Sequence, residues 1–300
     1  FRRVLRLAVV DAPRRGRRQD QEEGTGPRPT SAASTLRTQR VFASMPVSGF
    51  LLTVSVFLLC ALAPLSARAA HPLITEDTAT QGQGNSQLEL TSEHTARREN
   101  SANQMLMLTT TAFSYGVVDS VDVILMLPHL RLGHSVAAGT PGAQGLTDLG
   151  LDVKWRFYEK EKLSFALKPG ITLPTGDDTR NLGTGRHTWS AYVTASHATA
   201  PWTWLLHLGH VHHNNTFSER VDIWHASAAV VRQAGEILKL ILDAGIDTNT
   251  DRGAEADPVF LITGLIYTPR RNFDIDVGYR MESTESWRAR TLLAGLTVRW

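Results

Sequence analysis

Charged side chains of both signs recur at every second position in several stretches of the sequence. Between residues 148 and 158, Asp152, Lys154 and Arg156 alternate with apolar residues. Because successive side chains of an extended chain point to opposite faces, these charges share one face and the apolar residues share the other. Such a face can position a polar solute. The residues that we expect to line it are Asp148, Asp152, Lys154, Arg156, Lys168, Lys239, Asp243, Asp247, Asp274, Asp276 and Arg280.

Two interpretations of these charges stay open at the level of the sequence. In the first, they line a polar passage for small solutes. In the second, they form ion pairs that fill the interior, since charges of this kind cannot be left facing lipid. An open bore favours a transport role, and close ion pairing favours a structural one.

Histidines concentrate in the same half of the chain, at His197, His207, His210, His212, His213 and His225. Imidazole nitrogens bind zinc, copper and nickel. His210 and His212 are two residues apart and would share one face of a strand, but carboxylates are few nearby. We therefore expect no metal ion and no other cofactor, and His207, His210 and His212 are only weak candidate ligands.

Hydrolytic catalysis would need a serine activated by a histidine. Ser196 precedes His197 directly, and neighbours along a strand point to opposite faces. Neither a phosphate-binding loop, a dinucleotide fingerprint nor a zinc-protease motif occurs in the sequence. We expect the protein not to be an enzyme.

The elements that carry these residues are stretches of about ten residues that alternate apolar and polar, the pattern of strands in membrane barrels. Soluble sandwich strands also alternate, so the assignment depends on the whole series and not on any single strand. The twelve predicted strands are residues 83–96, 104–115, 121–132, 146–158, 163–173, 188–198, 202–212, 222–233, 237–248, 258–268, 273–281 and 290–300.

The predicted connections alternate in length. After odd-numbered strands they are longer and polar, over residues 97–103, 133–145, 174–187, 213–221, 249–257 and 282–289, and after even-numbered strands they are tight. Short periplasmic turns and longer external loops are typical of a barrel whose termini are both on the inner side. An even number of strands also lets the sheet close without edges. In one external loop, Pro174, Thr175, Gly176 and Asp177 are predicted to make turns.

The first 70 residues differ from the rest. Residues 1–44 hold ten arginines and four acidic residues and show no apolar periodicity, so they are interpreted as disordered or as over-extended translation. Residues 45–70 are predicted to be a signal peptide, because the apolar run at 50–62 is shorter than the roughly 20 residues of a membrane-spanning helix. Ala67, Arg68 and Ala69 predict cleavage before Ala70 or His71.

Cleavage would change both the charge and the thiol chemistry of the chain. Residues 71–300, the predicted barrel domain, contain 20 basic and 25 acidic residues, so their net charge is −5. This argues against a nucleic-acid partner, which requires clustered positive charge. The single cysteine, Cys60, lies in the apolar run, so a disulfide framework is excluded.

The last predicted strand ends on an aromatic residue. Leu292, Ala294, Leu296 and Val298 share one face with Trp300, the last residue of the sequence. A terminal alternating strand that ends in Phe or Trp resembles the signal that barrel-assembly machinery reads in the outer membrane, so Trp300 is the predicted assembly signal. Other aromatic residues lie near strand ends, as in the girdles at the membrane interface.

Three segments carry a resemblance to a known family. They are HPLITEDTATQG at 71–82, GLTDLGLDVKWRF at 145–157, and LPTGD at 173–177 followed by LGTG at 182–185. Together they resemble bacterial proteins labelled "MetA-pathway of phenol degradation", also called outer-membrane transporters. The resemblance covers residues 71–300 and implies an outer-membrane barrel, sometimes encoded near genes for the breakdown of aromatic compounds.

Together these features predict an all-β protein, a transmembrane antiparallel up-and-down β-barrel of about 12 strands in the bacterial outer membrane. We expect a passive channel or uptake barrel for small solutes, and the resemblance implies aromatic or other hydrophobic ones. The alternative is a non-conducting barrel with a structural or surface-binding role. The expected partners are outer-membrane lipid, the barrel-assembly machinery and a small-molecule solute.

Overall fold

The computed structural model describes residues 71–99, 102–133 and 142–300. In these residues the chain is built almost wholly of antiparallel strands. Their bounds are β1 (Ser86–Glu99), β2 (Ala102–Val118), β3 (Val121–Leu132), β4 (Ala143–Leu146), β5 (Leu149–Lys160), β6 (Leu163–Leu173), β7 (Thr188–Thr199), β8 (Trp202–His212), β9 (Asp222–Gln233), β10 (Leu238–Asp247), β11 (Val259–Arg270), β12 (Phe273–Ser283) and β13 (Trp287–Arg299). A short 3-10 helix, η1 (Asp178–Arg180), lies between β6 and β7.

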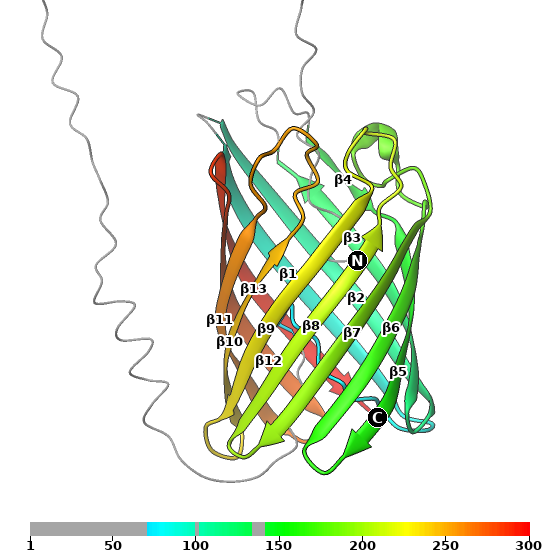
Figure 1. Ribbon diagram of the computed structural model, residues 1–300, viewed down its shortest axis with the longest axis vertical. Helices are drawn as coiled ribbons and strands as arrows, with labels where there is room; N and C mark the ends of the chain where they lie inside the picture. The colour runs from blue at the N-terminus through cyan, green and yellow to red at the C-terminus, as the bar shows by residue number, and fades with distance from the viewer. Residues whose placement is uncertain (1–70, 100–101, 134–141) are drawn as a thin grey trace, which may run out of the picture. The chain divides into compact units, whose positions relative to one another are not determined.

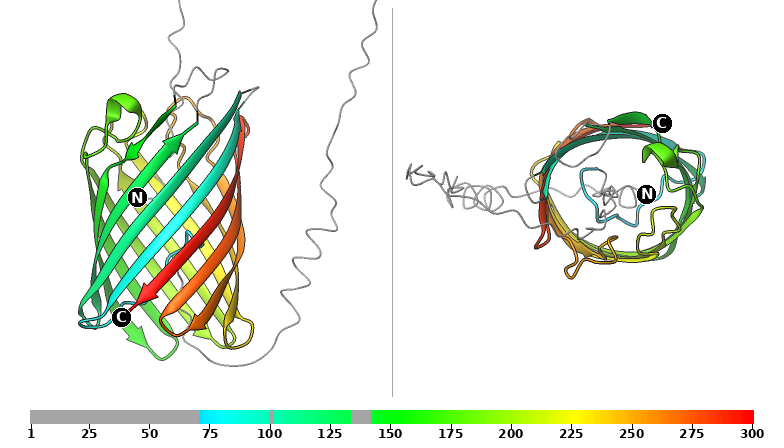
Figure 2. Two further views of the ribbon diagram at one scale, coloured as in Figure 1. Left: turned by 180° about the vertical axis from the view of Figure 1, so that it is seen from behind. Right: turned by 90° about the horizontal axis from the view of Figure 1, so that it is seen from above.

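Each long strand pairs with its neighbours in the chain, and β1 pairs with β13 as well as with β2. The first and last strands therefore close a ring of twelve, which Figures 1 and 2 show as a barrel of tilted strands. The short strand β4 is additional and pairs with β3 beside one end of β5. Closure satisfies the backbone groups that an open sheet would leave at its edges. The predicted fold is confirmed.

The two faces of the barrel differ as the alternating sequence predicts. Along β13 the side chains are alternately buried and exposed from Trp287 to Arg299. Leu292, Leu296 and Val298 are exposed on the outside, whereas Thr291 and Leu293 are buried. An outward apolar face with a more polar interior is the pattern that lipid imposes on barrel strands. No helix in the described part of the chain is long and apolar enough to cross a membrane.

The predicted strand over residues 146–158 is divided in the structure. β4 ends at Leu146, and β5 begins at Leu149. At the break, the Asp148 carboxylate accepts hydrogen bonds from the backbone N–H groups of Gly176 (3.0 Å) and Thr184 (2.7 Å). A side chain that is held by the following loop draws its own residue out of the ladder, so the strand is interrupted there.

The prediction of a long loop over residues 97–103 is wrong. β1 continues to Glu99, which pairs with Ala102 at the start of β2. The Arg97 guanidinium lies 4.2 Å from the centre of the Trp287 ring and 3.0 Å from the Glu99 carboxylate. Because of these contacts, the paired strands β1 and β2 continue through polar residues. Charged residues alone therefore did not indicate a loop here. The predicted loop over 282–289 also shortens, to residues 284–286 between β12 and β13.

The first strand is shifted by three residues, from the predicted 83–96 to Ser86–Glu99. Gly82 and Gly84 have positive φ angles of 82° and 79°, a conformation that glycine adopts without strain and that an extended strand does not use. Residues 82–85 therefore form a turn that leads into β1. The signal peptide and the segment before it lie outside the described residues.

Candidate functional site

The predicted inward-facing residues are largely hidden from solvent. Eight of the eleven are buried, and Arg156, Lys168 and Arg280 are half-buried. Lys154 and Lys168 line a cavity of about 180 Å³ inside the barrel. A role for these residues in passing a solute stays a prediction.

Residues 71–85, which we call the luminal segment, run from the inside of the barrel to the turn before β1. Figure 2 shows this segment, in cyan, within the ring of strands when the barrel is viewed from above. Most of the segment from His71 to Thr80 is buried. From His71 it runs through the interior towards the turn before β1. It contacts the wall near His71, at Ile74 and Thr75, at Glu76 and Asp77, and at Gln81, so the wall and the segment form one site.

The first residues of the luminal segment pack directly against glycines of the wall, a contact that we call the glycine seat. His71 Nδ1 lies 2.5 Å from the Asp276 carboxylate on β12, and both side chains are almost wholly buried. A Cβ added to Gly278 would lie 2.9 Å from Pro72, and one added to Gly295 would lie 2.7 Å from His71 Nδ1. Neighbouring strands therefore need glycine here because the segment approaches the wall too closely for a side chain.

The middle of the segment is held through its backbone. The Asp243 carboxylate on β10 accepts hydrogen bonds from the N–H groups of Ile74 (2.7 Å) and Thr75 (2.9 Å) and from the Thr75 hydroxyl (2.6 Å). Asp243 is fully buried. Donors aimed at an ionised carboxylate make stronger bonds than neutral pairs do, so this contact anchors the segment to the wall.

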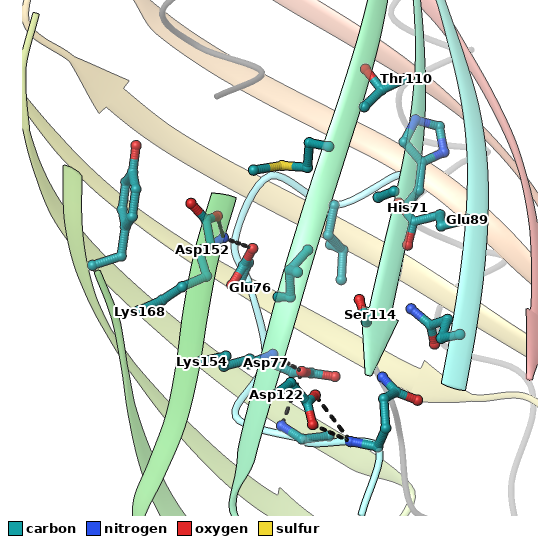
Figure 3. A pocket seen from close by; sticks show the side chains of 18 of the residues that line it. His71, Glu76, Asp77, Glu89, Thr110, Ser114, Asp122, Asp152, Lys154 and Lys168 are labelled. Atoms are coloured by element: carbon teal, nitrogen blue, oxygen red, sulfur yellow. Dashed lines mark hydrogen bonds and ion pairs between the residues drawn. The ribbon is translucent and has the colours of Figure 1, made fainter. Parts of the chain in front are cut away.

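Two acidic residues of the segment pair with lysines of the wall (Figure 3). The Glu76 carboxylate pairs with Lys168, which also lies 3.5 Å from Asp152, and Asp77 pairs with Lys154 at 3.0 Å. Burial by itself would raise the pKa of Glu76, but the ammonium groups of Lys168 and Lys154 outweigh it and hold that pKa well below its usual range. Glu76 therefore stays ionised at neutral and mildly acidic pH.

The segment leaves the interior beside the turn between β2 and β3. The Gln81 N–H lies 3.0 Å from each Asp122 carboxylate oxygen. A Cβ on Gly116 would lie 1.9 Å from the carbonyl oxygen of Gly82, so the two backbones meet directly. The exit of the segment is thus as closely fitted as its beginning.

The other predicted charges mostly pair within the wall. Arg280 lies 2.9 Å from Glu93 and 3.8 Å from Glu282. Arg299 lies 2.8 Å from Asp274. The pairs Arg280–Glu93 and Arg299–Asp274 join neighbouring or nearby strands around the ring, whereas Arg280 and Glu282 lie on the same strand, β12.

Three further members of the predicted set have different surroundings. Asp247 pairs with His225 at 2.7 Å. Arg156 lies near the β2–β3 turn, 3.2 Å from Glu159. Lys239 is buried.

The interior is not polar throughout. Leu73 of the luminal segment packs among buried side chains of β8 to β13 that form an apolar cluster. The cavity lies mainly on the other side of the segment, along β1 to β8. The cluster members from the wall are Leu205, Ala229, Val231, Ile241, Phe260, Ile262, Ile266 and Leu293.

The three histidines noted as weak metal candidates do not meet. His207 is buried and lines the cavity, whereas His210 and His212 lie on the opposite face of β8, each 3.2 Å from Asp222. Within the described residues, no group of three or more His, Cys, Asp or Glu side chains could hold a metal ion.

The predicted loop motif, residues 174–177, makes hydrogen bonds to the residues between β4 and β5. The Thr175 hydroxyl accepts a hydrogen bond from the Leu149 N–H at 3.0 Å, and Gly176 donates to Asp148. The Asp177 carbonyl accepts from the Leu182 N–H at 2.9 Å. These bonds fold the loop that begins at Pro174 back over β4 and β5.

Trp300 completes the ring. Its N–H donates to the Ser86 carbonyl at 3.0 Å, and the Ser86 N–H donates to the Trp300 carbonyl at 2.8 Å. Its indole ring lies 6.3 Å from the Phe113 ring, on the outside of the barrel. Its role as an assembly signal stays a prediction.

The luminal segment is the functional feature that sequence reasoning missed. Its run of Thr75, Glu76, Asp77, Thr78 and Thr80 just before the first strand offered a signal, because polar residues that are not in strands can pair with an inward charged face. Nothing local to those residues distinguishes an inserted segment from a periplasmic tail.

A closed antiparallel ring with an apolar outer face and a charged interior defines the class of transmembrane β-barrels. The chain belongs to the family described as "Putative MetA-pathway of phenol degradation", whose sequence profile matches residues 72–300. The predicted resemblance is confirmed. None of the curated proteins compared with this chain matches it.

Solved structures share the fold at low sequence identity. An outer membrane channel from Pseudomonas putida F1 superposes with a TM-score of 0.61 at 12% identity, covering 80% of this chain and all (100%) of that one. The NanC porin has a TM-score of 0.49 at 8% identity, covering 70% of this chain and 98% of that one. The CymD monoaromatic hydrocarbon channel has a TM-score of 0.45 at 8% identity, covering 73% and 89%. At these identities the likeness concerns the fold alone.

Proposed function

We propose that this chain is a passive outer-membrane channel for small solutes, whose lumen is narrowed by its own N-terminal segment. The observation that carries the proposal is the cavity beside the luminal segment, enclosed by a barrel with an apolar outer face. Family membership agrees with this proposal.

Location in the outer membrane follows from the same features. Insertion into the inner membrane requires long apolar helices, which strands of alternating polarity do not provide. Such strands suit a barrel that closes in the outer membrane. The predicted partners are therefore lipid on the outer face, the assembly machinery during insertion and a solute inside.

A second function is favoured by the pairing inside the barrel. Glu76 and Asp77 neutralise two wall lysines, and Asp243 anchors the backbone of the segment. If these contacts hold permanently, the barrel is non-conducting, and its role is structural or is the binding of partners by its loops. The two functions differ in whether small solutes pass through the barrel.

Planar-bilayer conductance and liposome swelling separate the two functions. We expect the purified full-length protein to give discrete current steps and to let small solutes swell liposomes. Heat-denatured protein reconstituted in the same way is the control. Folded protein that gives neither current nor swelling would reject the channel and leave the structural barrel.

A further inference from the structure

Glu76 holds its wall partner through one carboxylate oxygen. Oε1 accepts a hydrogen bond from Lys168 Nζ, and within the described residues Oε2 has no hydrogen-bond partner. The Glu76 side chain is 33% exposed, against 12% for Lys168. Figure 3 shows Glu76 at the cavity between the luminal segment and the wall that carries Asp152 and Lys168. A carboxylate that holds a buried ammonium group through one oxygen can be replaced by another carboxylate.

Aromatic rings lie next to that ammonium group. Lys168 Nζ is 5.4 Å from the centre of the Tyr192 ring, and the Tyr192 and His207 rings are 5.0 Å apart. Both rings line the cavity. The row continues through His225, 5.2 Å from His207, to Phe260, 6.3 Å further on. Tyr192 has room because a Cβ on Gly209 would lie 2.1 Å from its ring.

This combination selects the chemistry of a ligand. A fixed ammonium group suits a carboxylate, and adjacent ring edges and faces suit an aromatic body. The cavity of about 180 Å³ is large enough for one ring, since a buried cavity of roughly 150 Å³ accepts benzene. Ligand pockets commonly combine a few placed polar groups with rings and apolar side chains in this way.

We propose that Lys168, Tyr192 and His207 form a binding site for small aromatic carboxylates, and that Glu76 occupies the place of the ligand carboxylate until the ligand displaces it. The proposal rests on the proposed function, because it names the class of solute that the same lumen takes. It also gives the luminal segment a role beyond obstruction, that of a tethered competitor.

Charge balance explains why an anion is required. Lys168 lies between Glu76 and Asp152, so exchange of Glu76 for a ligand carboxylate leaves the charge around Lys168 unchanged. A neutral ligand of the same shape would leave the buried ammonium group with fewer counter-charges, which is costly in a poorly hydrated interior. The site should therefore prefer benzoate to benzamide.

Isothermal titration of the full-length protein in detergent tests the site, with benzoate as the probe. Benzamide and cyclohexanecarboxylate serve as comparison ligands, because one lacks the charge and the other lacks the ring. We expect benzoate to bind about tenfold more tightly than benzamide, the scale of one hydrogen bond to a charged group. Cyclohexanecarboxylate should bind more weakly by a smaller factor, about threefold to tenfold.

Three variants test the site and the competing role of Glu76. Glu76→Gln should tighten benzoate binding by about tenfold, because a larger fraction of the sites is then open. Glu89→Gln is the matched control, since Glu89 lines the same cavity on β1, outside the Glu76–Lys168–Asp152 contacts. It removes the same charge from the same cavity, so it should raise benzoate affinity clearly less than Glu76→Gln does if the competition is local. Lys168→Gln should weaken binding by about tenfold to a hundredfold.

Several outcomes would overturn the site. They are equal affinity for benzamide, no gain with Glu76→Gln, or an equal gain with Glu89→Gln, which would indicate only a general field. A change of binding in Lys168→Gln or in Glu76→Gln counts only if that variant keeps its folded gel mobility. Binding is measured without flux, so benzoate binding by a non-conducting barrel would reject the channel alone. Conductance without binding would reject the site alone.

Discussion

Asp243 shows how a single residue joins the segment to the wall. Its carboxylate is fully buried and accepts three hydrogen bonds from Ile74 and Thr75. A buried carboxylate needs hydrogen-bond donors, and the docked segment supplies three of them to Asp243. The same reasoning applies to Lys154, whose ammonium group lies 3.0 Å from Asp77.

Asp243→Asn is expected to loosen the segment while the barrel stays closed. The amide removes the charge and one acceptor oxygen, which should cost about 1.5–3 kcal/mol of docking free energy. Residues 71–300 lack cysteine, so one cysteine in place of buried Thr80 can report the motion. Its labelling by a water-soluble maleimide should become at least several-fold faster.

Asp251→Asn, in the exposed loop between β10 and β11, is the matched control and should leave the labelling rate unchanged. Equal labelling rates in Asp243→Asn and in the parent protein would mean that Asp243 does not anchor the segment.

At the scale of an element, each strand performs two tasks on opposite faces. The outward residues of β12, such as Ile275 and Val277, are exposed apolar side chains. Its inward residues include Asp276, which binds His71, and Gly278, which admits Pro72. Since the period of a strand is two, the register that turns the apolar face outward also aims these residues at the segment.

Gly278→Val is expected to unseat the start of the luminal segment. Valine suits a strand, so β12 should form, but its Cβ would lie 2.9 Å from Pro72. Overpacking of this kind costs about 1–3 kcal/mol. Hydrogen–deuterium exchange of the peptide covering residues 71–85 should become faster.

Ile275→Val, on the outer face of the same strand, should leave that exchange unchanged, because the residue does not face the segment. Unchanged exchange in Gly278→Val would contradict the glycine seat.

For the whole molecule, closure matters more than any single contact. Every long strand has two partners, and the pair between Ser86 and Trp300 completes the ring where β1 meets β13. Ion pairs also join strands along the inner wall, as between Arg280 on β12 and Glu93 on β1, which flank β13. Such a ring opens cooperatively, because no strand can leave without breaking two ladders.

Heat-modifiable mobility tests the closed barrel. The unboiled protein in mild detergent should migrate faster on a gel than the boiled protein, since a closed barrel stays compact until its ladders break. Trp300→Ala should retain this behaviour once folded but should lower the folded fraction in the outer membrane by several-fold, if Trp300 is the assembly signal. Identical migration of boiled and unboiled protein would count against the barrel.

Much of the fold was predictable, because strand identity depends on local alternation. Four strands have the predicted bounds: β3, β6, β8 and β9. The errors lie where a distant residue decides. Asp148 leaves its strand because the loop after β6 binds it, and Arg97 extends β1 because Trp287 lies beneath it.

The sequence by itself determined the alternation, the number of long strands and the face that carries the charges, since these depend on neighbours a few residues apart. Only the tertiary structure decided what those charges meet. Glu76 lies 92 positions from Lys168 and His71 lies 205 positions from Asp276. Whether an inward charge faces open water, another strand or the luminal segment depends on ring closure, which brings residues far apart in the sequence into one small interior.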